Sequence, residues 1–212
     1  MFEDRVEAGR KLAKELLKYR GQKIVVLAIP RGGVVVGYEV AKELNAPLDI
    51  IVPRKIGAPD NPELAIGAVT QDGTVILNPQ LMQYLGVSEI YVQEEVRNQV
   101  NEIERRIKKY RGEKAYPSLK DKIVILVDDG IATGYTMRAA IASIKKQKPS
   151  ILIVAVPVGP PDTIQTLKSE ADKVVCLSTP EMFQAIGQFY RNFSQTSDEE
   201  VIHLLQLSKK TD

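Results

Sequence analysis

The sequence predicts an α/β fold built on a central parallel sheet flanked by helices. Short, unbroken apolar runs rich in Ile and Val recur along the chain, which is typical of strands buried on both faces of a sheet. Most of these runs are followed by a turn and a segment of helical spacing, and this alternation indicates that the strands are parallel. At 212 residues, the chain is long enough for one large domain with a small attachment.

The first elements follow this rhythm. Apolar side chains near the start of the chain are spaced as one face of a helix. An apolar run then leads into a turn that contains Pro and two Gly, and a helix and a second apolar run follow. The predicted elements are a helix at 2–19, a strand at 23–30, a turn at 30–33, a helix at 34–45 and a strand at 48–53.

The middle of the chain, about residues 54–117, departs from the rhythm and is predicted to be an insertion. Its first part is rich in Gly and Pro and predicts a loop, and residues 63–69 and 73–78 predict a two-stranded ribbon. Residues 88–111 predict an amphipathic helix with Ser88 as its N-cap. We expect this helix to pack on the protein's own core, and a dimer seam is the alternative.

The rhythm returns in the second half, so residues 1–178 are predicted to form the core domain that carries the insertion. Residues 179–212 contain three of the four Phe and predict a small C-terminal hood, with a last helix that starts at Ser197 or Asp198. The predicted elements of the second half are a strand at 122–129, a turn at 130–136, a helix at 137–148, a strand at 151–157, a helix at 163–170 and a strand at 173–178.

Composition and charge exclude several classes of protein. Hydrophobic residues at 44% and charged residues at 26% are ordinary for a globular protein and argue against disorder. The balance of 29 Lys and Arg against 27 Asp and Glu argues against a dedicated nucleic-acid binder. Because the chain has no apolar run of 18 residues and no signal-peptide pattern, we expect a cytoplasmic protein with no membrane partner.

The chain has one Cys, Cys176, and one His, His203. These counts exclude an internal disulfide, a multi-Cys zinc site and a His-pair metal motif, and they fit a reducing compartment. We expect Cys176 to be inert core and His203 to lie on a helix surface.

The segment from Ile123 to Thr136 carries the strongest functional signal. A buried strand brings two adjacent carboxylates, Asp128 and Asp129, to its C-terminal end, where ligands bind in open α/β sheets. The small residues of the next turn allow a phosphate to approach the backbone N–H groups at a helix start. Because carboxylates repel phosphate but accept hydrogen bonds from sugar hydroxyls, the segment predicts a sugar-phosphate site. Asp-Asp-Gly alone could be a plain turn, but the T-G-x-T that follows argues against this alternative.

Two further groups could bind anions. The turn made by Pro30, Arg31, Gly32 and Gly33 can wrap pyrophosphate oxygens with backbone N–H groups and a guanidinium, and a plain turn between strand and helix is the alternative. Two adjacent cations, Arg54 and Lys55, open the Gly- and Pro-rich stretch. A solvated charge pair at a strand end is the alternative for these two cations.

The string IVILVDDGIATGYT resembles the phosphoribosyl-pyrophosphate (PRPP) motif of type I phosphoribosyltransferases, in which apolar residues precede D-D-x-x-x-T-G-x-T. The likeness extends over nearly the whole chain, to a subgroup known mainly as predicted phosphoribosyltransferases. It rests on the segments FEDRVEAG, LAIPRGG, RKIGAPDNPELAIGAV, VAVPVGPPDT and FSQTSDEEV. The resemblance implies a type I phosphoribosyltransferase-like fold and a reaction class, but no particular acceptor.

The resemblance also implies the roles of the motif residues. Asp128 and Asp129 would bind the ribose 2′ and 3′ hydroxyls. The 5-phosphate would be held by Gly130, Ile131, Ala132, Thr133, Gly134, Tyr135 and Thr136. The pyrophosphate loop would be the turn from Pro30 to Gly33, with a cis peptide bond between Pro30 and Arg31.

Further roles follow from the same resemblance. Arg54 and Lys55 would lie in a mobile loop that closes over PRPP, and one or both would neutralise the leaving pyrophosphate. Phe183, after the last strand, would stack on the base, and packing in the core is the alternative for this residue. Members that use 6-oxopurines have an Asp at the position of Ala132 and a Lys in the region matching residues 154–162, and their absence argues against a 6-oxopurine acceptor.

The predicted function is Mg²⁺-dependent transfer of the 5-phosphoribosyl group from PRPP to a small nitrogenous acceptor, with a nucleobase as the expected class. Mg²⁺ would be held mainly by substrate and water, so no direct protein ligands are expected. We expect a homo-oligomer, with a dimer first, and a place in nucleotide metabolism. The alternative is a PRPP- or nucleotide-binding regulator on the same fold, against which the near-neutral charge argues.

Overall fold

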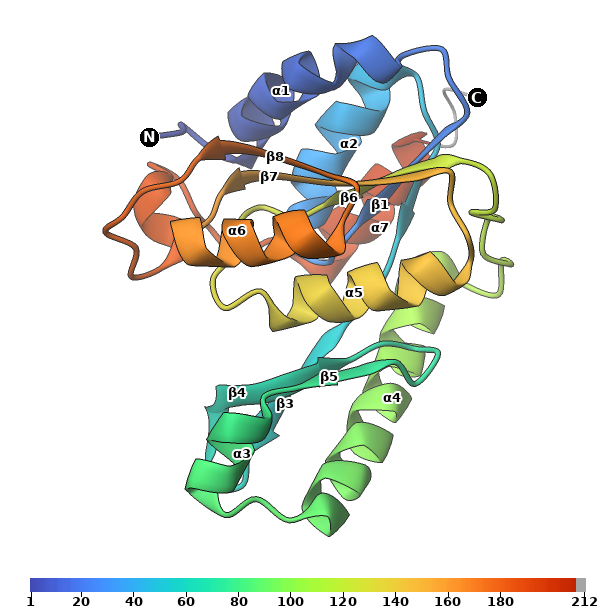
Figure 1. The fold of residues 1–212 in the computed structure, drawn as a ribbon. Coiled ribbons are helices and arrows are strands. Elements are labelled where there is room, and N and C mark those ends of the chain that lie inside the picture. Colours follow the sequence, from blue (N-terminus) through green and yellow to red (C-terminus); the bar gives the residue numbers. More distant parts are fainter. Residues whose placement is uncertain (209–212) are drawn as a thin grey trace.

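Residues 1–208, which the computed structural model describes, form a central parallel sheet with helices on both faces and a smaller sheet at one end (Figure 1). The five central strands lie in the order β2-β1-β6-β7-β8, and every neighbouring pair is parallel. This arrangement confirms the predicted fold class. The strands are β1 (Ile24–Ala28), β2 (Leu48–Ile50), β6 (Ile123–Val127), β7 (Ile151–Val158) and β8 (Lys173–Ser178).

Two groups of helices cover the two faces of the central sheet (Figure 1). Apolar side chains of α1, α2 and α7 pack on one face, and those of α5 and α6 pack on the other. The helices and the short 3₁₀ segments η1 and η2 are α1 (Arg5–Leu16), η1 (Leu17–Tyr19), α2 (Gly32–Leu44), α5 (Tyr135–Lys146), α6 (Pro161–Glu170), η2 (Ile186–Phe189) and α7 (Asp198–Ser208). The last helix starts where the sequence predicts, whereas α5 starts two residues early. None of the described helices is both long and apolar enough to cross a membrane.

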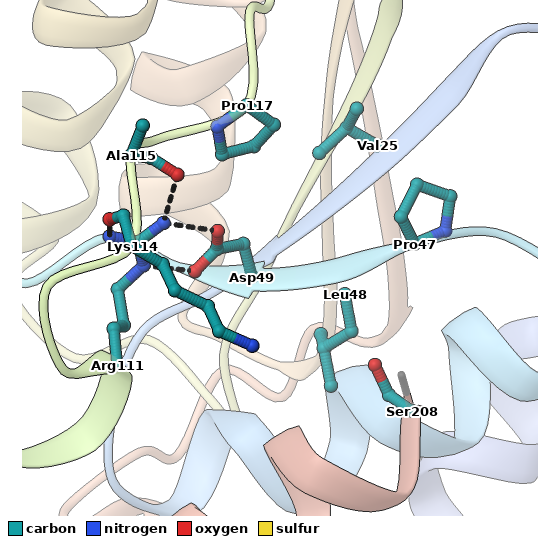
Figure 2. Close-up of a pocket in the computed structure, with 9 residues that line it drawn as sticks. All are labelled: Val25, Pro47, Leu48, Asp49, Arg111, Lys114, Ala115, Pro117 and Ser208. Atoms are coloured by element: carbon teal, nitrogen blue, oxygen red, sulfur yellow. Dashed lines mark hydrogen bonds and ion pairs between the residues drawn. The ribbon is translucent and has the colours of Figure 1, made fainter. Parts of the chain in front are cut away.

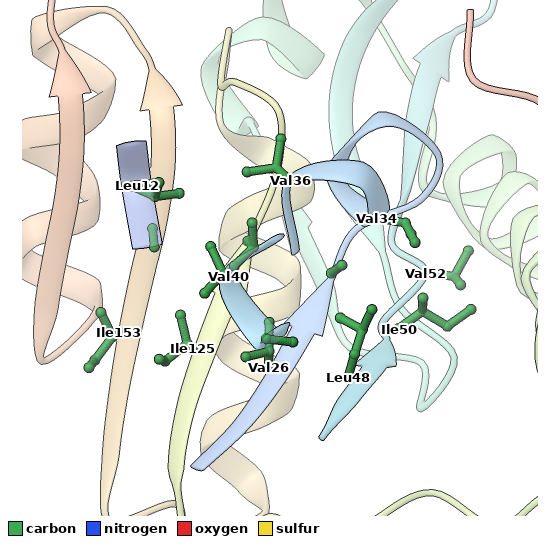
Figure 3. Packing of buried hydrophobic residues seen from close by; sticks show 14 of the residues in the cluster. Leu12, Val26, Val34, Val36, Val40, Leu48, Ile50, Val52, Ile125 and Ile153 are labelled. Carbon is green, nitrogen blue, oxygen red and sulfur yellow. The ribbon is translucent and has the colours of Figure 1, made fainter. Parts of the chain in front are cut away.

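A row of apolar side chains crosses the sheet and explains its composition (Figure 3). Leu48, Val26, Ile125 and Ile153 are neighbours in register on four successive strands. They belong to the same buried cluster as Val40 of α2. On β1, β6 and β7 the next residues face the second cluster, so these strands are apolar on both faces, and each buried side chain contributes about 1.5–3 kcal/mol.

The insertion is a three-stranded antiparallel sheet followed by two helices, at the lower end of the molecule in Figure 1. Its elements are β3 (Arg54–Ala58), β4 (Asn61–Val69), β5 (Val75–Leu77), α3 (Pro79–Leu85) and α4 (Glu89–Arg111). The predicted long helix is confirmed, and Ser88 caps it by accepting a hydrogen bond from the Tyr91 N–H at 3.2 Å. The helix α3 was not predicted.

The prediction of a loop at the start of the insertion is wrong, because Arg54 and Lys55 begin strand β3, which pairs with β4. The Gly and Pro residues that suggested a loop sit at an irregularity in this pairing. A Cβ on Gly57 would lie 2.5 Å from the carbonyl oxygen of Pro62, so the two backbones approach closely there. Glycine and proline are tolerated in strands at such bulges.

The insertion is fixed to the core through the turn between β4 and β5. Lys146, at the end of α5, donates to Oδ2 of Asp72 at 3.2 Å and to Oγ1 of Thr74 at 2.5 Å. Burial alone would raise the pKa of Asp72, but hydrogen bonds from Thr70, Thr74 and Lys146 hold it well below its usual range. The ribbon is therefore docked on the helix that begins at the predicted phosphate turn.

Arg111, the last residue of α4, anchors the other end of the insertion to edge strand β2 (Figure 2). Its Nε and Nη2 donate to the two carboxylate oxygens of Asp49, at 2.6 and 2.8 Å. Its Nη1 and Nη2 also donate to the carbonyls of Lys114 and Ala115, and its guanidinium lies 3.8 Å from the centre of the Tyr116 ring. Because the protein itself uses these donors, the hollow of about 220 Å³ beside them is a structural joint.

The chain has one Cys and one His, and both lie outside the segments that the sequence predicts to bind substrate. Cys176 is half-buried in β8, and burial raises the pKa of its thiol, which keeps it in the less reactive neutral form. His203 is exposed on α7, as expected.

Candidate functional site

A cleft of about 350 Å³ opens at the carboxyl end of β6. Its floor is the segment from Asp128 to Met137, which runs from the strand end into the first turn of α5. The β3–β4 hairpin supplies Lys55, Glu63, Leu64 and Ala65 on one side, and Ile186 of the hood lines another part. The sequence-predicted phosphate turn therefore faces a real hollow between core, insertion and hood.

The acid pair lies against the glycine turn that precedes α2. A Cβ on Gly32 would overlap Oδ2 of Asp129, and one on Gly33 would be 2.8 Å from Oδ1 of Asp128. Any larger residue would collide with the carboxylates, which explains the two glycines. The predicted pyrophosphate turn and ribose site are thus direct neighbours.

The two carboxylates differ in their surroundings. Burial and the nearby charge of Asp129 raise the pKa of Asp128 well above its usual range. Asp129 instead has an ion-pair partner, because Arg5 Nε lies 2.6 Å from its Oδ2. Oδ1 of Asp128 also accepts a hydrogen bond from the Asp129 N–H at 2.8 Å. Burial therefore disfavours a charge on Asp128, whereas Asp129 has a cation beside it.

The turn after the acid pair is shaped to leave backbone N–H groups at a helix start. Gly134, the residue before α5, adopts a φ of 79°, which favours glycine. Ile131 is buried, and its N–H donates to the Val158 carbonyl at 2.9 Å, so it supports the turn from below. Thr163, at the start of α6, donates to the carbonyl of Ala132 at 2.9 Å. A helix start of this kind is suited to an anion.

The glycine turn after β1 has the backbone that the resemblance implied, with a cis peptide bond between Pro30 and Arg31. Arg31 is one-third exposed, and its Nη1 lies 3.7 Å from Oδ1 of Asp198 in α7. The guanidinium of this turn therefore has an acidic partner inside the protein.

The two cations of β3 point in different directions. Lys55 lines the cleft and pairs across the hairpin with Glu63, with 2.7 Å between Nζ and Oε2. Arg54 does not line it; its Nε donates to Oε1 of Gln99 on α4, and burial lowers its pKa. Successive residues of a strand face opposite sides, which explains the difference.

Comparison with known proteins agrees with this geometry. The family model described as a phosphoribosyl transferase domain matches residues 2–194. The chain belongs to the phosphoribosyltransferase family. Two Mycobacterium tuberculosis proteins, from strains CDC 1551 and H37Rv, each carry the name "Putative phosphoribosyl transferase" and are 44% identical over 205 residues. The match covers 97% of this chain but 46% of each relative, so the chain spans less than half the length of these curated proteins.

Solved structures share the phosphoribosyltransferase fold. The crystal structure of TT1426 from Thermus thermophilus is 41% identical, with a TM-score of 0.81 and 97% of each chain covered. A purine phosphoribosyltransferase from Pyrococcus horikoshii is 18% identical, with a TM-score of 0.50 and 90% of each chain covered. At that identity, the second likeness supports the fold alone.

In this phosphoribosyltransferase chain, Phe183 does not line the cleft. Its ring lies 5.2 Å from that of Phe189 on the hood, while Ile186 between them reaches the cleft. Phe193 packs deeper, with its ring 4.9 Å from that of Tyr190. Among these hood residues, Ile186 is the one that lines the cleft.

Four cleft-associated residues were missed from the sequence: Arg5, Glu63, Thr163 and Tyr190. Arg5 and Thr163 lie within segments that carry the family likeness, FEDRVEAG and VAVPVGPPDT, and this was the signal that could have found them. The Tyr190 hydroxyl donates to the Asp129 carbonyl at 2.6 Å, and no local sequence pattern predicts that contact.

Proposed function

We propose that this phosphoribosyltransferase moves the 5-phosphoribosyl group of PRPP to a nitrogenous acceptor, with a nucleobase as the acceptor class. The observation that carries the proposal is the contact between the two motif turns, in which Gly32 and Gly33 lie against Asp129 and Asp128. The cleft thereby offers a helix start for a phosphate and carboxylates for a diol, and the cationic turn that would bind a second anion lies directly against those carboxylates. PRPP carries a 5-phosphate, two ribose hydroxyls and a pyrophosphate on one ribose.

In the proposed complex, the turn from Gly130 to Thr136 holds the 5-phosphate with backbone N–H groups and Thr hydroxyls. Asp128 and Asp129 accept hydrogen bonds from the ribose hydroxyls. The turn from Pro30 to Gly33, with Lys55 from the hairpin, faces the pyrophosphate. The 5-phosphate, the ribose hydroxyls and the pyrophosphate each meet protein groups that suit their charge, so the substrate has one favoured orientation.

Mg²⁺ fits this donor set as a substrate-held ion. No group of three or more His, Cys, Asp and Glu suited to a metal occurs within residues 1–208. Mg²⁺ is commonly bound by one or two carboxylates together with substrate phosphates and water, and Asp128 and Asp129 line the cleft, as does Glu63 of the hairpin. When bound, it would neutralise charge on the pyrophosphate.

The reaction would be a displacement at C1 of the ribose. The lone pair of the acceptor nitrogen forms the new bond to C1 as the bond from C1 to the pyrophosphate oxygen breaks, and that oxygen leaves with the electron pair. A proton carried by the acceptor nitrogen passes to solvent. The transition state resembles an oxocarbenium ion, so the protein contributes positioning and charge stabilisation.

The proposed acceptor contacts come from the hairpin and the hood. Ala132 and the absence of Lys in residues 154–162 argue against a 6-oxopurine. Leu64 of the hairpin and Ile186 of the hood line the cleft and offer apolar contact to a flat ring. Phe183 stands beside Ile186 on the hood and is proposed to stack on the base. A homodimer, a cytoplasmic location and a place in nucleotide metabolism stay predictions.

The test is calorimetric titration with Mg-PRPP. The double variant Asp128→Asn with Asp129→Asn should lose about 1.5–3 kcal/mol of binding for each charge-assisted hydrogen bond. Asp162→Asn, an exposed acid at the start of α6, is the matched control and should bind like the wild type. A nucleobase panel assayed for pyrophosphate release then separates an enzyme from a regulator, since binding without release from any base would support the regulator.

A further inference from the structure

Arg5 is a buried cation that joins four separate parts of the chain and that the proposed reaction does not yet use. It lies in the first turn of α1, which Asp4 caps by accepting a hydrogen bond from the Glu7 N–H at 2.8 Å. Its Nε is 2.6 Å from Oδ2 of Asp129, and both side chains are 12% exposed. Because removing two charges from water costs free energy, an ion pair this buried stabilises the protein only where both partners are well positioned.

The other side of the guanidinium faces the hood. Nη1 of Arg5 donates to the carbonyl of Ser194 at 2.7 Å. The guanidinium carbon lies 3.9 Å from the centre of the Phe193 ring, within range of a cation–π contact. The same arginine therefore holds an acid of the cleft floor and the backbone of the hood.

The start of the chain is itself a part of the hood. The Phe2 N–H donates to the Phe189 carbonyl at 2.7 Å, and the Arg191 N–H donates to the Phe2 carbonyl at 2.9 Å. The rings of Phe2 and Tyr190 are 5.4 Å apart, and the Tyr190 hydroxyl donates to the Asp129 carbonyl. The segment that carries Arg5 is therefore hydrogen-bonded to the hood, and the side chain of Arg5 reaches Asp129.

The pyrophosphate turn also touches this pair. A Cβ on Gly32 would be 2.6 Å from Nε of Arg5, besides its closer approach to Asp129. The charge of Arg5 also acts on the neighbouring acid, since it opposes the rise in the pKa of Asp128. The proposed ribose and pyrophosphate sites therefore both lie within contact of Arg5 or of its partner.

We propose that Arg5 is a positioning residue: it fixes the carboxylate of Asp129 for the ribose and couples that carboxylate to the hood. This inference rests on the proposed function, because it assigns Asp129 to the ribose hydroxyls. Arg5 acts through Asp129 and does not itself contact the substrate.

The test is a double-mutant cycle between Arg5→Gln and Asp129→Asn, read as the dissociation constant of Mg-PRPP by calorimetry. Arg5→Gln in the wild-type background should raise this constant about tenfold or more, as expected for a lost charge-assisted contact. In the Asp129→Asn background the same change should cost less than about twofold, since its target is already gone. Arg5→Lys keeps the charge and should restore part of the loss.

Arg191→Gln is the matched control. Arg191 also joins the start of the chain to the hood, with 3.1 Å between Nη1 and Oε2 of Glu3, but this pair is mostly exposed and away from Asp129. It should leave Mg-PRPP binding unchanged in both backgrounds. Thermal melting of every variant shows whether it is folded, and if Arg5→Gln fails to fold, Arg5→Lys runs the same cycle.

Two outcomes overturn the inference and are distinguishable. If the wild type binds Mg-PRPP and the Arg5 change multiplies the dissociation constant equally in both backgrounds, or not at all, Arg5 does not position Asp129. If the wild type does not bind Mg-PRPP, the proposed function fails and this inference fails with it.

Discussion

Arg31 in the turn before α2 and Asp198 at the start of α7 form an ion pair, with 3.7 Å between Nη1 and Oδ1. Asp198 also accepts hydrogen bonds from Lys109 at 2.5 Å and from the Tyr110 hydroxyl at 2.6 Å, both on α4. One carboxylate therefore ties the proposed pyrophosphate turn to the last helix and to the insertion. A bound pyrophosphate would compete with Asp198 for Arg31.

The variant Asp198→Asn should bind pyrophosphate more tightly, by up to about fivefold, because a partly exposed ion pair is worth at most about 1 kcal/mol. It should also melt at a lower temperature, because α7 loses its charged contact with α4. Calorimetry and thermal melting give the two values. Glu199→Gln removes an equal charge from the same turn of α7, and an equal gain in that control would show a general charge effect instead.

The same carboxylate predicts a pH dependence. The hydrogen bonds from Lys109 and Tyr110 lower the pKa of Asp198 below its ordinary value of 3.8. A lowered pKa in the folded state stabilises the fold above the unfolded-state pKa, and this contribution is lost as pH falls through the folded-state pKa. Between about pH 5 and pH 2, the wild type should therefore lose stability more steeply than Asp198→Asn, and parallel curves in a urea series would contradict this role.

Asp128→Asn should make the protein more stable while weakening PRPP binding. Burial and Asp129 raise the pKa of Asp128, so the folded state holds its proton more tightly than the unfolded state does. Its contribution to stability therefore falls as pH rises from about 4 through the raised pKa. The melting temperature of Asp128→Asn should exceed that of the wild type increasingly toward neutral pH, and a variant that is less stable at neutral pH would refute the charge penalty.

Lys55→Ala and Arg54→Ala should separate turnover from stability. Lys55 lines the cleft, so its loss should lower kcat more than it raises KM for PRPP if it stabilises departing pyrophosphate. Arg54 contacts Gln99 on α4, so its loss should lower the melting temperature with a smaller effect on kcat. A rise in KM alone for Lys55→Ala would make it a ground-state binder.

Phe183→Ala should weaken nucleotide binding by about 1–3 kcal/mol, the scale of base stacking on an aromatic ring, with little change in melting temperature. Phe193→Ala should mainly lower stability, because its ring packs on Tyr190 and under the guanidinium of Arg5. Titration with nucleoside monophosphates compares the two. A larger loss for Ile186→Ala than for Phe183→Ala would move the base contact to the residue that lines the cleft.

The parallel sheet and its acid pair could be predicted because their signals are local. A strand buried on both faces must be apolar throughout, and Asp128 and Asp129 stand out at the end of such a run. The turn from Gly130 follows at once in the sequence. Strand, acids and turn are therefore one continuous pattern.

The parts that sequence reasoning missed depend on contacts between distant residues. Arg5 is 124 positions from Asp129, and apart from the family likeness of the segment FEDRVEAG, nothing near Arg5 in the chain marks it as more than a helix-surface cation. Strand β3 was missed for another reason, since Gly57 and Pro62 serve an irregular strand pairing and look like loop residues when taken alone.

The position of the insertion has a consequence for how the chain folds. The central pairing of β1 with β6 joins Ile24 to Ile123, so about a hundred residues must be closed into a loop before it forms. The β3–β4 hairpin joins Arg54 to Val69 and needs a far shorter closure. We therefore expect the insertion to gain order early and the central sheet to set the folding rate, as in proteins dominated by long-range pairing. The cleft, which needs both units, would then be completed last.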